Sequence, residues 1–326
     1  MNYILRRILI SIGIVIIVVN LDFILPRLVP GNAAEINTSG GIGQVNQIAI
    51  LTSRYGLDKP LWEQYYIYLH GIFASWPPNL GTSFQYFPES VSALIAGRIG
   101  WTLLLIFTSF ALSIIIVYYM AAATSMRRGG KFEISSLYFS ISTHAIPIYW
   151  FALVILWVFA VVLGWFPVFG SVDPNLKFGS NAYTISVLWH LVLPVVALTL
   201  SLLGENYLVL RGSMQEVLQS DYVIAAKSRG LRGRLIATRY ILRNSLLPLV
   251  SILTFSLSGL ISRVVLVEVV FGYPGLGDLI VDAILNHDYP VLEGTFFVLT
   301  LMIVVGGLIG DILLVRLDPK LRISAT

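Results

Sequence analysis

Residues 204–248 read GENYLVLRGSMQEVLQSDYVIAAKSRGLRGRLIATRYILRNSLLP, and they decide how the rest of the chain is interpreted. The stretch holds seven basic side chains and three acidic ones, and apolar runs of membrane length flank it on both sides. Ionised groups are costly inside a bilayer, so the stretch is predicted to be a loop between two membrane spans. Its bases are Arg211, Lys227, Arg229, Arg232, Arg234, Arg239 and Arg243.

The composition is that of a membrane protein. Hydrophobic residues make up 57% of the 326 residues and charged residues only 12%, with a mean hydropathy of +0.84. Ordinary soluble domains carry about 25% charged residues. The chain has no cysteine, which excludes disulfides and cysteine-ligated metals. The net charge of +4 is explained below by loop asymmetry, so no nucleic-acid partner is expected.

Six apolar runs are long enough to cross a bilayer as helices, which satisfy their own backbone hydrogen bonds there. The first follows Arg6 and Arg7 and exceeds the apolar core of a signal peptide, so it is expected to be a retained span. The predicted fold is an all-α polytopic membrane protein with both termini on one side. The runs are 8–29, 101–124, 137–163, 185–204, 245–270 and 295–316.

Charge sets the predicted orientation. Fifteen Lys and Arg residues fall on the face that holds both termini, and five fall on the other face. The positive-inside rule places the first face, and with it both termini, in the cytoplasm of a cell-membrane protein. The predicted parts are the N-terminus with the first span (1–29), an extracytoplasmic subdomain (30–100), a five-helix core (101–316) that includes the cytoplasmic loop 205–244, and a cytoplasmic C-terminus (317–326).

The extracytoplasmic segment 30–100 contains one clear helical pattern. Residues 61–73, LWEQYYIYLHGIF, show helical apolar spacing with aromatic side chains on one side. Turn signals flank this stretch at Pro30-Gly31, Gly40-Gly41 and Trp76-Pro77-Pro78. Two interpretations remain open: a small helical subdomain at the outer mouth, or an interfacial helix that rests on lipid.

Motifs of the common enzymes are missing. The chain has no GxxxxGK[ST] phosphate loop, so nothing indicates that it hydrolyses ATP itself. It has no HExxH motif, and its four histidines are scattered, so neither a metal site nor a cofactor is expected. A GxSxG nucleophile elbow is also absent, and the chain is predicted not to be an enzyme.

Four charged residues fall inside the predicted spans: Asp22, Arg263, Glu268 and Asp311. Each lies near a span end, which favours structural or interfacial roles over a proton relay. Arg263 and Glu268 are expected to pair along their helix.

Two prolines, Pro147 and Pro194, lie inside or at the edge of the third and fourth spans. Proline can kink a helix and free a carbonyl near a pathway. A pore-lining kink and a plain structural kink both remain open.

Within the basic loop, a short helix is predicted over 222–229. Ser220 or Asp221 can cap its beginning, and Gly230 can end it. The pair Ala225-Ala226 leaves little side-chain bulk, which suits insertion into a groove on another protein. A solvated loop that touches anionic lipid would explain the charge but not this spacing.

The same residues resemble the cytoplasmic coupling loop of binding-protein-dependent ABC importer permeases, whose pattern is EAAxxxG followed by an apolar-Pro pair. Here the pattern stands as IAAKSRG from Ile224 to Gly230, and it ends at Pro248. Ile224 replaces the acidic residue of the general pattern. DYV at 221–223 and RNSLLP at 243–248 are similar to the dipeptide/oligopeptide branch.

Further stretches in the same order are similar to that branch, so the resemblance covers nearly the whole chain. They are YILRR (3–7), PGN (30–32, with Asn32 where the branch has Asp), YGLDKPLWEQY (55–65), LGTS (80–83), VEVVFGYPGLGDLIVDAILNHDYPV (267–291) and LDPKLR (317–322).

The resemblance implies the transmembrane subunit of an ATP-driven importer for peptides. It implies a second homologous permease, two ABC ATPases and an extracytoplasmic substrate-binding protein as partners, within a lipid bilayer. Oligosaccharides or metal chelates are alternative cargoes. An ion-coupled secondary transporter would need midplane ionisable residues and an internal repeat, neither of which is found. A membrane-embedded hydrolase would need a catalytic motif, which is also not found.

The resemblance also implies two sets of candidate site residues. Those implied to couple the chain to its ATPases are Asp221, Ala225, Ala226, Gly230, Arg243, Asn244 and Pro248. Those with candidate gating, pathway or structural roles are Pro147, Pro194, Glu268, Pro274 and Gly275.

Overall fold

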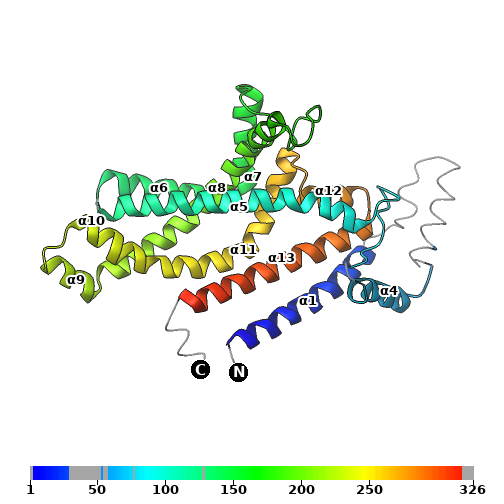
Figure 1. Cartoon of the computed structure of the whole chain (residues 1–326), viewed down its shortest axis with the longest axis horizontal. Helices are drawn as coiled ribbons and strands as arrows, with labels where there is room; N and C mark the ends of the chain where they lie inside the picture. The colour runs from blue at the N-terminus through cyan, green and yellow to red at the C-terminus, as the bar shows by residue number, and fades with distance from the viewer. Residues whose placement is uncertain (1–2, 29–52, 54–57, 76–77, 127–128, 318–326) are drawn as a thin grey trace. The chain divides into compact units, whose positions relative to one another are not determined.

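The computed structural model describes residues 3–28, 53, 58–75, 78–126 and 129–317 (Figure 1). The sequence motif at 30–32 and most of that at 317–322 lie outside the described residues, as does the turn signal at Gly40-Gly41.

Within the described residues the chain is helical and forms no strand, apart from an isolated bridge between Thr82 and Ser90. The elements in chain order are α1 (Tyr3–Leu28), α4 (Leu61–Phe73), α5 (Val91–Met126), α6 (Lys131–Ala145), α7 (Ile148–Ile155), the π-helix η1 (Leu156–Val162), α8 (Asn181–Leu218), α9 (Asp221–Ser228), α10 (Gly233–Leu235), the π-helix η2 (Ile236–Leu242), α11 (Arg243–Phe271), α12 (Leu276–Leu285) and α13 (Tyr289–Leu317).

The membrane-spanning character of the fold is carried by four long helices and two bent pairs. The four are Leu5–Leu28, Val91–Thr124, Asn181–Leu218 and Tyr289–Ile312. The bent pairs are Lys131–Ala145 with Ile148–Val162, and Gly259–Phe271 with Leu276–Leu285. If each bent pair is one span, the chain has the six spans of the predicted all-α polytopic fold.

The third predicted span, 137–163, is broken instead of continuous. Helix α6 ends at Ala145 and α7 begins at Ile148, with an angle of 101° between the two arms. Pro147 is the cause, because the residue before a proline is pushed out of the helical region. Ile146 accordingly has φ −84° and ψ 127°.

A second break separates α11 from α12, which are bent by 70°. Gly272 takes φ +52°, a left-handed conformation that favours glycine, and so allows the chain to leave the helix. The backbone N–H of Tyr273 then donates to the carbonyl of Glu268 over 2.8 Å. Pro274 and Gly275 complete the turn, and Gly275 stands at the beginning of α12.

Helix α8 continues without interruption for 38 residues, although Pro194 lies inside it. Its packing against α6 depends on Gly204, where a Cβ atom would lie 2.5 Å from the carbonyl oxygen of Ser140 and 2.8 Å from the backbone nitrogen of His144. Only glycine allows the two backbones to approach this closely. The long α8 therefore runs from the membrane region into the predicted basic loop.

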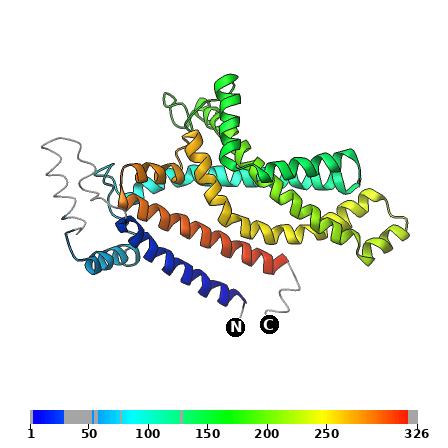
Figure 2. The same cartoon turned by 180° about the vertical axis from the view of Figure 1, so that it is seen from behind.

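The chain divides into two compact units. The first comprises 1–7, 103–273 and 305–326, and the second comprises 8–102 and 274–304. In the first unit, α9 and α10 follow one end of α8, as both views show (Figure 1, Figure 2). The second unit holds most of α1 together with α4, α12 and the beginning of α13.

Candidate functional site

The predicted short helix of the basic loop is present as α9. It covers Asp221–Ser228, one residue earlier at each end than predicted, and a two-residue link joins it to α8. Ser220 has the extended conformation of an N-cap, but its side chain makes no capping bond. Its hydroxyl donates instead to the carbonyl of Val217 over 2.5 Å. Asp221 places a negative charge in the first turn, which the helix dipole stabilises.

Gly230 ends α9 as predicted. It takes φ +69°, and its N–H donates to the carbonyl of Lys227 over 2.9 Å. The N–H of Leu231 donates to the carbonyl of Ala226 over 3.4 Å, and the two bonds together resemble a glycine-terminated helix end. The chain can therefore turn sharply toward η2.

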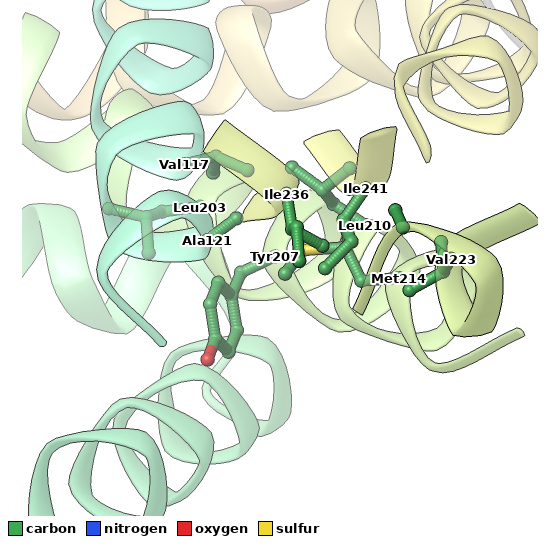
Figure 3. Close-up of a cluster of buried hydrophobic side chains, with 10 residues drawn as sticks. Val117, Ala121, Leu203, Tyr207, Leu210, Met214, Val223, Ile236 and Ile241 are labelled. Atoms are coloured by element: carbon green, nitrogen blue, oxygen red, sulfur yellow. The ribbon is translucent and has the colours of Figure 1, made fainter. Parts of the chain in front are cut away.

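One face of α9 is packed against the first unit's own core. Val223 is fully buried and Ala226 is 3% exposed. Figure 3 shows Val223 at one edge of a buried cluster, with Met214 beside it. The buried cluster, which we call the α9 cluster, draws on α5, α8, α9 and η2, and consists of Val117, Ala121, Leu203, Tyr207, Leu210, Met214, Val223, Ala226, Ile236 and Ile241.

This packing changes the expected role of the alanine pair. Both alanines were expected to form a small exposed surface, but Ala226 faces inward and only Ala225 is exposed. Tyr222 and Ile224 are also exposed, at 44% and 53%. The outward face of α9 is thus larger and more apolar than an alanine pair would make it. The i, i+3 spacing of Val223 and Ala226 is the sequence signal that could have found the buried face.

The beginning of α11 lies next to α9. Asn244 donates from Nδ2 to the carbonyl of Tyr240 over 2.8 Å and to the hydroxyl of Tyr222 over 3.3 Å. Arg243 and Pro248 lie in the first two turns of α11, and their side chains fall outside the described part of the structure. Asn244 is therefore the predicted coupling residue of α11 that the structure connects to α9.

Most of the described bases of the loop face solvent. Lys227, Arg229, Arg232 and Arg234 are all exposed, and they lie in the last turn of α9 and in the segment that follows it. Arg211 differs, because its Nη2 lies 2.9 Å from Oε1 of Glu133 on α6.

The predicted pairing of Arg263 with Glu268 is wrong. Nη2 of Arg263 lies 2.8 Å from Oε2 of Glu205 on α8, and Nη1 donates to the carbonyl of Ser201 over 3.3 Å. Residues five apart on a helix do not share a face, so the adjacent helix supplies the partner. Glu268 is fully buried.

The remaining candidate gating residues lie at breaks or in packed positions. Pro147 stands at the α6–α7 bend, and Pro274 and Gly275 stand at the α11–α12 bend. Pro194 is buried inside α8. Helix α7 contacts both α8 and α11, so the α6–α7 bend belongs to the packed core of the first unit. Three of these positions therefore stand at the two breaks where the helix direction changes.

Sequence reasoning missed a polar junction in the second unit. Asp288 is 1% exposed, and its Oδ2 accepts bonds from the hydroxyl of Ser83 and, over 3.1 Å each, from the N–H groups of Phe84 and Gln85. This Asp288 junction joins two family-like motifs that lie 205 residues apart.

A second set of contacts extends the junction along α12. Tyr86 donates to Oδ2 of Asp282 over 2.5 Å, and Nη1 of Arg98 lies 2.7 Å from Oδ2 of Asp278. The hydrogen bond to Asp282, followed by partial burial, raises the pKa of Tyr86 to about 12. The phenol therefore stays protonated and continues to donate throughout the neutral pH range.

Within the described residues, no group of three or more His, Cys, Asp or Glu side chains could hold a metal ion. The fold and the site together define a multi-pass membrane protein with a short, partly exposed helix that is followed by basic residues.

Comparison with known proteins shows which family of membrane proteins this chain belongs to. Residues 114–323 match the sequence model described as "Binding-protein-dependent transport system inner membrane component", and residues 1–106 match the model for the N-terminal part of such components. The chain belongs to this family and is a permease subunit of a transport system.

Named relatives cover the whole chain. It is 32% identical to a putative peptide permease protein of Brucella suis biovar 1, over 99% of this chain and 100% of the relative. It is 32% identical to the oligopeptide transport system permease protein AppB of Bacillus subtilis, over 98% and 99%. It is 30% identical to the dipeptide transport system permease protein DppB of Lactococcus lactis, over 99% of both chains.

Proposed function

We propose that this chain is the transmembrane subunit of an ATP-driven importer that carries peptides across the cell membrane. The names of its relatives, which are oligopeptide and dipeptide permeases, support peptides as the cargo. The chain has no phosphate loop of its own, which supports ATP hydrolysis by separate subunits. A second homologous permease, two ATPases and an extracytoplasmic binding protein complete the proposed assembly.

The outward face of α9 is the proposed contact with an ATPase. One observation carries this assignment: a short helix is anchored to the core by Val223 and Ala226 while Tyr222, Ile224 and Ala225 face outward. The surplus of bases on the same side supports a cytoplasmic location for the loop and for both termini.

The α9 cluster suggests how a push on this face would travel. Its buried side chains come from α5, α8 and η2, and η2 runs directly into α11. Because packed side chains resist compression, a displacement of α9 is passed to these helices together. Closure of the ATPases would then bias the core between two states that open to opposite sides.

The test is to separate the outward face from the buried face. Ala225→Arg and Ile224→Asp are expected to reduce co-purification of the ATPases and abolish peptide-stimulated ATP hydrolysis in proteoliposomes. Both variants should still insert in the membrane and keep normal thermal stability, because neither position is buried. Lys177→Ala, an exposed change in the segment between η1 and α8, is the matched control and should leave both activities unchanged.

Normal ATPase association and transport by both α9 variants would refute the coupling role. The cargo is tested separately by binding and uptake of labelled dipeptides, oligopeptides and oligosaccharides. Uptake of oligosaccharides alone would refute peptides as the cargo and leave the coupling role standing.

A further inference from the structure

Helix α4 in the second unit begins beside the end of α1. Nε of Arg27 on α1 donates to Oε1 of Gln64 over 3.3 Å. The hydroxyl of Tyr65 donates to Oδ1 of Asn20 over 2.8 Å. The first turns of α4 therefore contact the last two turns of α1.

The contacts then move toward the middle of α1. The rings of Tyr68 and Phe23 lie 5.6 Å apart, and Ile72 shares a buried cluster with Val19. From Gln64 to Ile72 the partners on α1 change overall from Arg27 to Val19, although the long side chain of Tyr65 reaches Asn20. The two helices therefore lie side by side and antiparallel.

The length of this contact gives a depth. Eight residues along either helix correspond to about 12 Å at a rise of 1.5 Å per residue. The candidate span in α1 is Leu5–Leu28, 24 residues, or about 36 Å against a hydrocarbon thickness of about 30 Å. Helix α4 therefore lies along the last third of the span instead of beyond it.

The segment that follows α4 gives a second measure. After α4, Leu80 lies against α13, where a Cβ atom on Gly294 would be 3.3 Å from its Cδ1. Leu80 also packs on the cluster that contains Phe297. The chain then rises to the Asp288 junction, nine residues before Phe297 and about 13 Å away along the helix axis. Both measures place the segment from the end of α4 to Leu80 at a similar depth along α1 and α13.

The side of α4 that faces away from α1 is aromatic and exposed. Trp62, Tyr66 and Phe73 are 72%, 65% and 67% exposed, and Ile67 is 42% exposed. His70 lies on the same side. Tryptophan, tyrosine and histidine combine an apolar body with a polar tip, and tryptophan and tyrosine are enriched where hydrocarbon meets headgroups.

Charged groups gather at the beginning of α4. Lys59 lies 2.6 Å from Glu63, and Arg27 lies 2.5 Å from Glu293. Helix α4 contains a single residue of the types Asp, Glu, Lys and Arg, which is Glu63 in its first turn. Charge at one end and aromatic side chains beyond it match the change from headgroups to acyl chains.

We propose that α4 is a re-entrant helix embedded in the lipid leaflet at the Leu28 end of α1. Its Trp62–Tyr66–Phe73 face contacts lipid, with Trp62 near the headgroups and Phe73 among the acyl chains. Lipid is the occupant because this face lies at the depth of Leu21 and Leu25, which are exposed on the same span. The proposal does not depend on the transported cargo.

The absence of cysteine makes a direct test possible. Single-cysteine variants of the full chain, Trp62→Cys, Tyr66→Cys and Phe73→Cys, are spin-labelled and reconstituted in lipid nanodiscs. Accessibility is then measured to oxygen, which concentrates in hydrocarbon, and to a water-soluble nickel chelate. All three positions are exposed, so the labels should leave the packing of α4 intact. Ile67→Cys supplies a fourth position on the same side.

Two further variants calibrate the measurement. Leu25→Cys on α1 is the lipid reference, and Phe178→Cys, which is 89% exposed in the segment before α8, is the aqueous reference. At Phe73, nickel accessibility is expected to be several-fold lower than at Phe178 and oxygen accessibility close to that at Leu25. The ratio of oxygen to nickel accessibility should rise from Trp62 through Tyr66 to Phe73.

Two results would overturn the proposal. Nickel accessibility at Phe73 equal to that at Phe178 would place α4 in water. Low accessibility to both oxygen and the nickel chelate would show that protein covers the face. If this loss of accessibility appears only after the extracytoplasmic binding protein is added, that protein is the cover.

Discussion

Asp288 and Ala226 both fasten a short segment to long helices, but they do so by opposite means. Asp288 holds the chain at 83–85 through three hydrogen bonds that converge on one carboxylate oxygen. Ala226 and Val223 hold α9 by apolar packing in the α9 cluster, where the described contacts are side-chain surfaces and not ion pairs (Figure 3).

The difference is one of directionality. A hydrogen bond to a buried carboxylate depends on distance and angle, so the Asp288 junction has one geometry. Apolar burial is non-directional and depends on area, so α9 can shift by small amounts while it stays buried. The segment proposed to receive a mechanical push is held chiefly by apolar burial, together with the hydrogen bond from Asn244 to the hydroxyl of Tyr222. The segment proposed to enter lipid is followed by the one held with directional bonds.

The largest effect is expected from removing the carboxylate of the rigid junction. Asp288→Ala leaves the N–H groups of Phe84 and Gln85 and the hydroxyl of Ser83 without their acceptor. Donors that lose a buried, charged acceptor cost about 3 kcal/mol in total. Thermal unfolding in nanodiscs should show this loss, and limited proteolysis should cut the chain near residue 84.

The matched control for this prediction is Asp278→Ala. Its carboxylate pairs with Arg98 and its side chain is 34% exposed, so the loss should stay below about 1 kcal/mol. Equal losses for the two variants would mean that burial of Asp288 adds nothing, and the contrast between the junction and the α9 cluster would fail.

A smaller effect is expected from enlarging the buried residue of the α9 cluster. Ala226→Leu adds three heavy atoms where the side chain is 3% exposed, and overpacking of this kind costs about 1–3 kcal/mol. Ala225→Leu makes the same change on the exposed neighbour and should alter stability by less than about 0.5 kcal/mol. Thermal unfolding of the two variants side by side tests which alanine faces the core. A larger loss for Ala225→Leu would reverse the assignment.

Several local elements could be predicted from the sequence because their signals are local. The bounds of α4, Leu61–Phe73, agree with the prediction because Pro60 begins the helix and the apolar spacing continues to its end. The bounds of α9 agree to one residue because Gly230 supplies a left-handed terminus that few other residues adopt. Four of the six apolar runs coincide with long helices, and the other two agree only if each bent pair is counted as one span, because length and hydropathy determine what can span a bilayer but do not show where a helix bends.

The errors concern partners that are distant in sequence. Arg263 pairs with Glu205, 58 residues away, because α8 and α11 are neighbours in the fold. The three donors of the Asp288 junction are more than 200 residues from their acceptor. Pro147 predicted a kink, but its size of 101° depends on how α7 packs on α8 and α11. No window of sequence contains these contacts.

The smallest effect is expected at the rim of the junction, where Tyr86 donates to Asp282. Tyr86→Phe removes one hydrogen bond on a partly exposed side chain and should cost about 1 kcal/mol or less at neutral pH. Its pH dependence identifies the bond. The pKa of Tyr86 is raised to about 12 from an ordinary value of 10.0, so between these values the folded protein retains a proton that the unfolded chain has lost.

The direction of the pH effect on stability follows from this difference in pKa. Unfolding releases a proton in this range, so the stability contributed by Tyr86 is complete below pH 10 and declines as the pH rises toward 12. The gap in melting temperature between the native chain and Tyr86→Phe should therefore be constant from pH 7 to 9 and shrink above pH 10. A difference in melting temperature that stays constant up to pH 11.5 would mean that the bond to Asp282 contributes nothing. In that case, only the buried hydrogen bonds at Asp288 would stabilise the contact between residues 83–86 and the α12–α13 region.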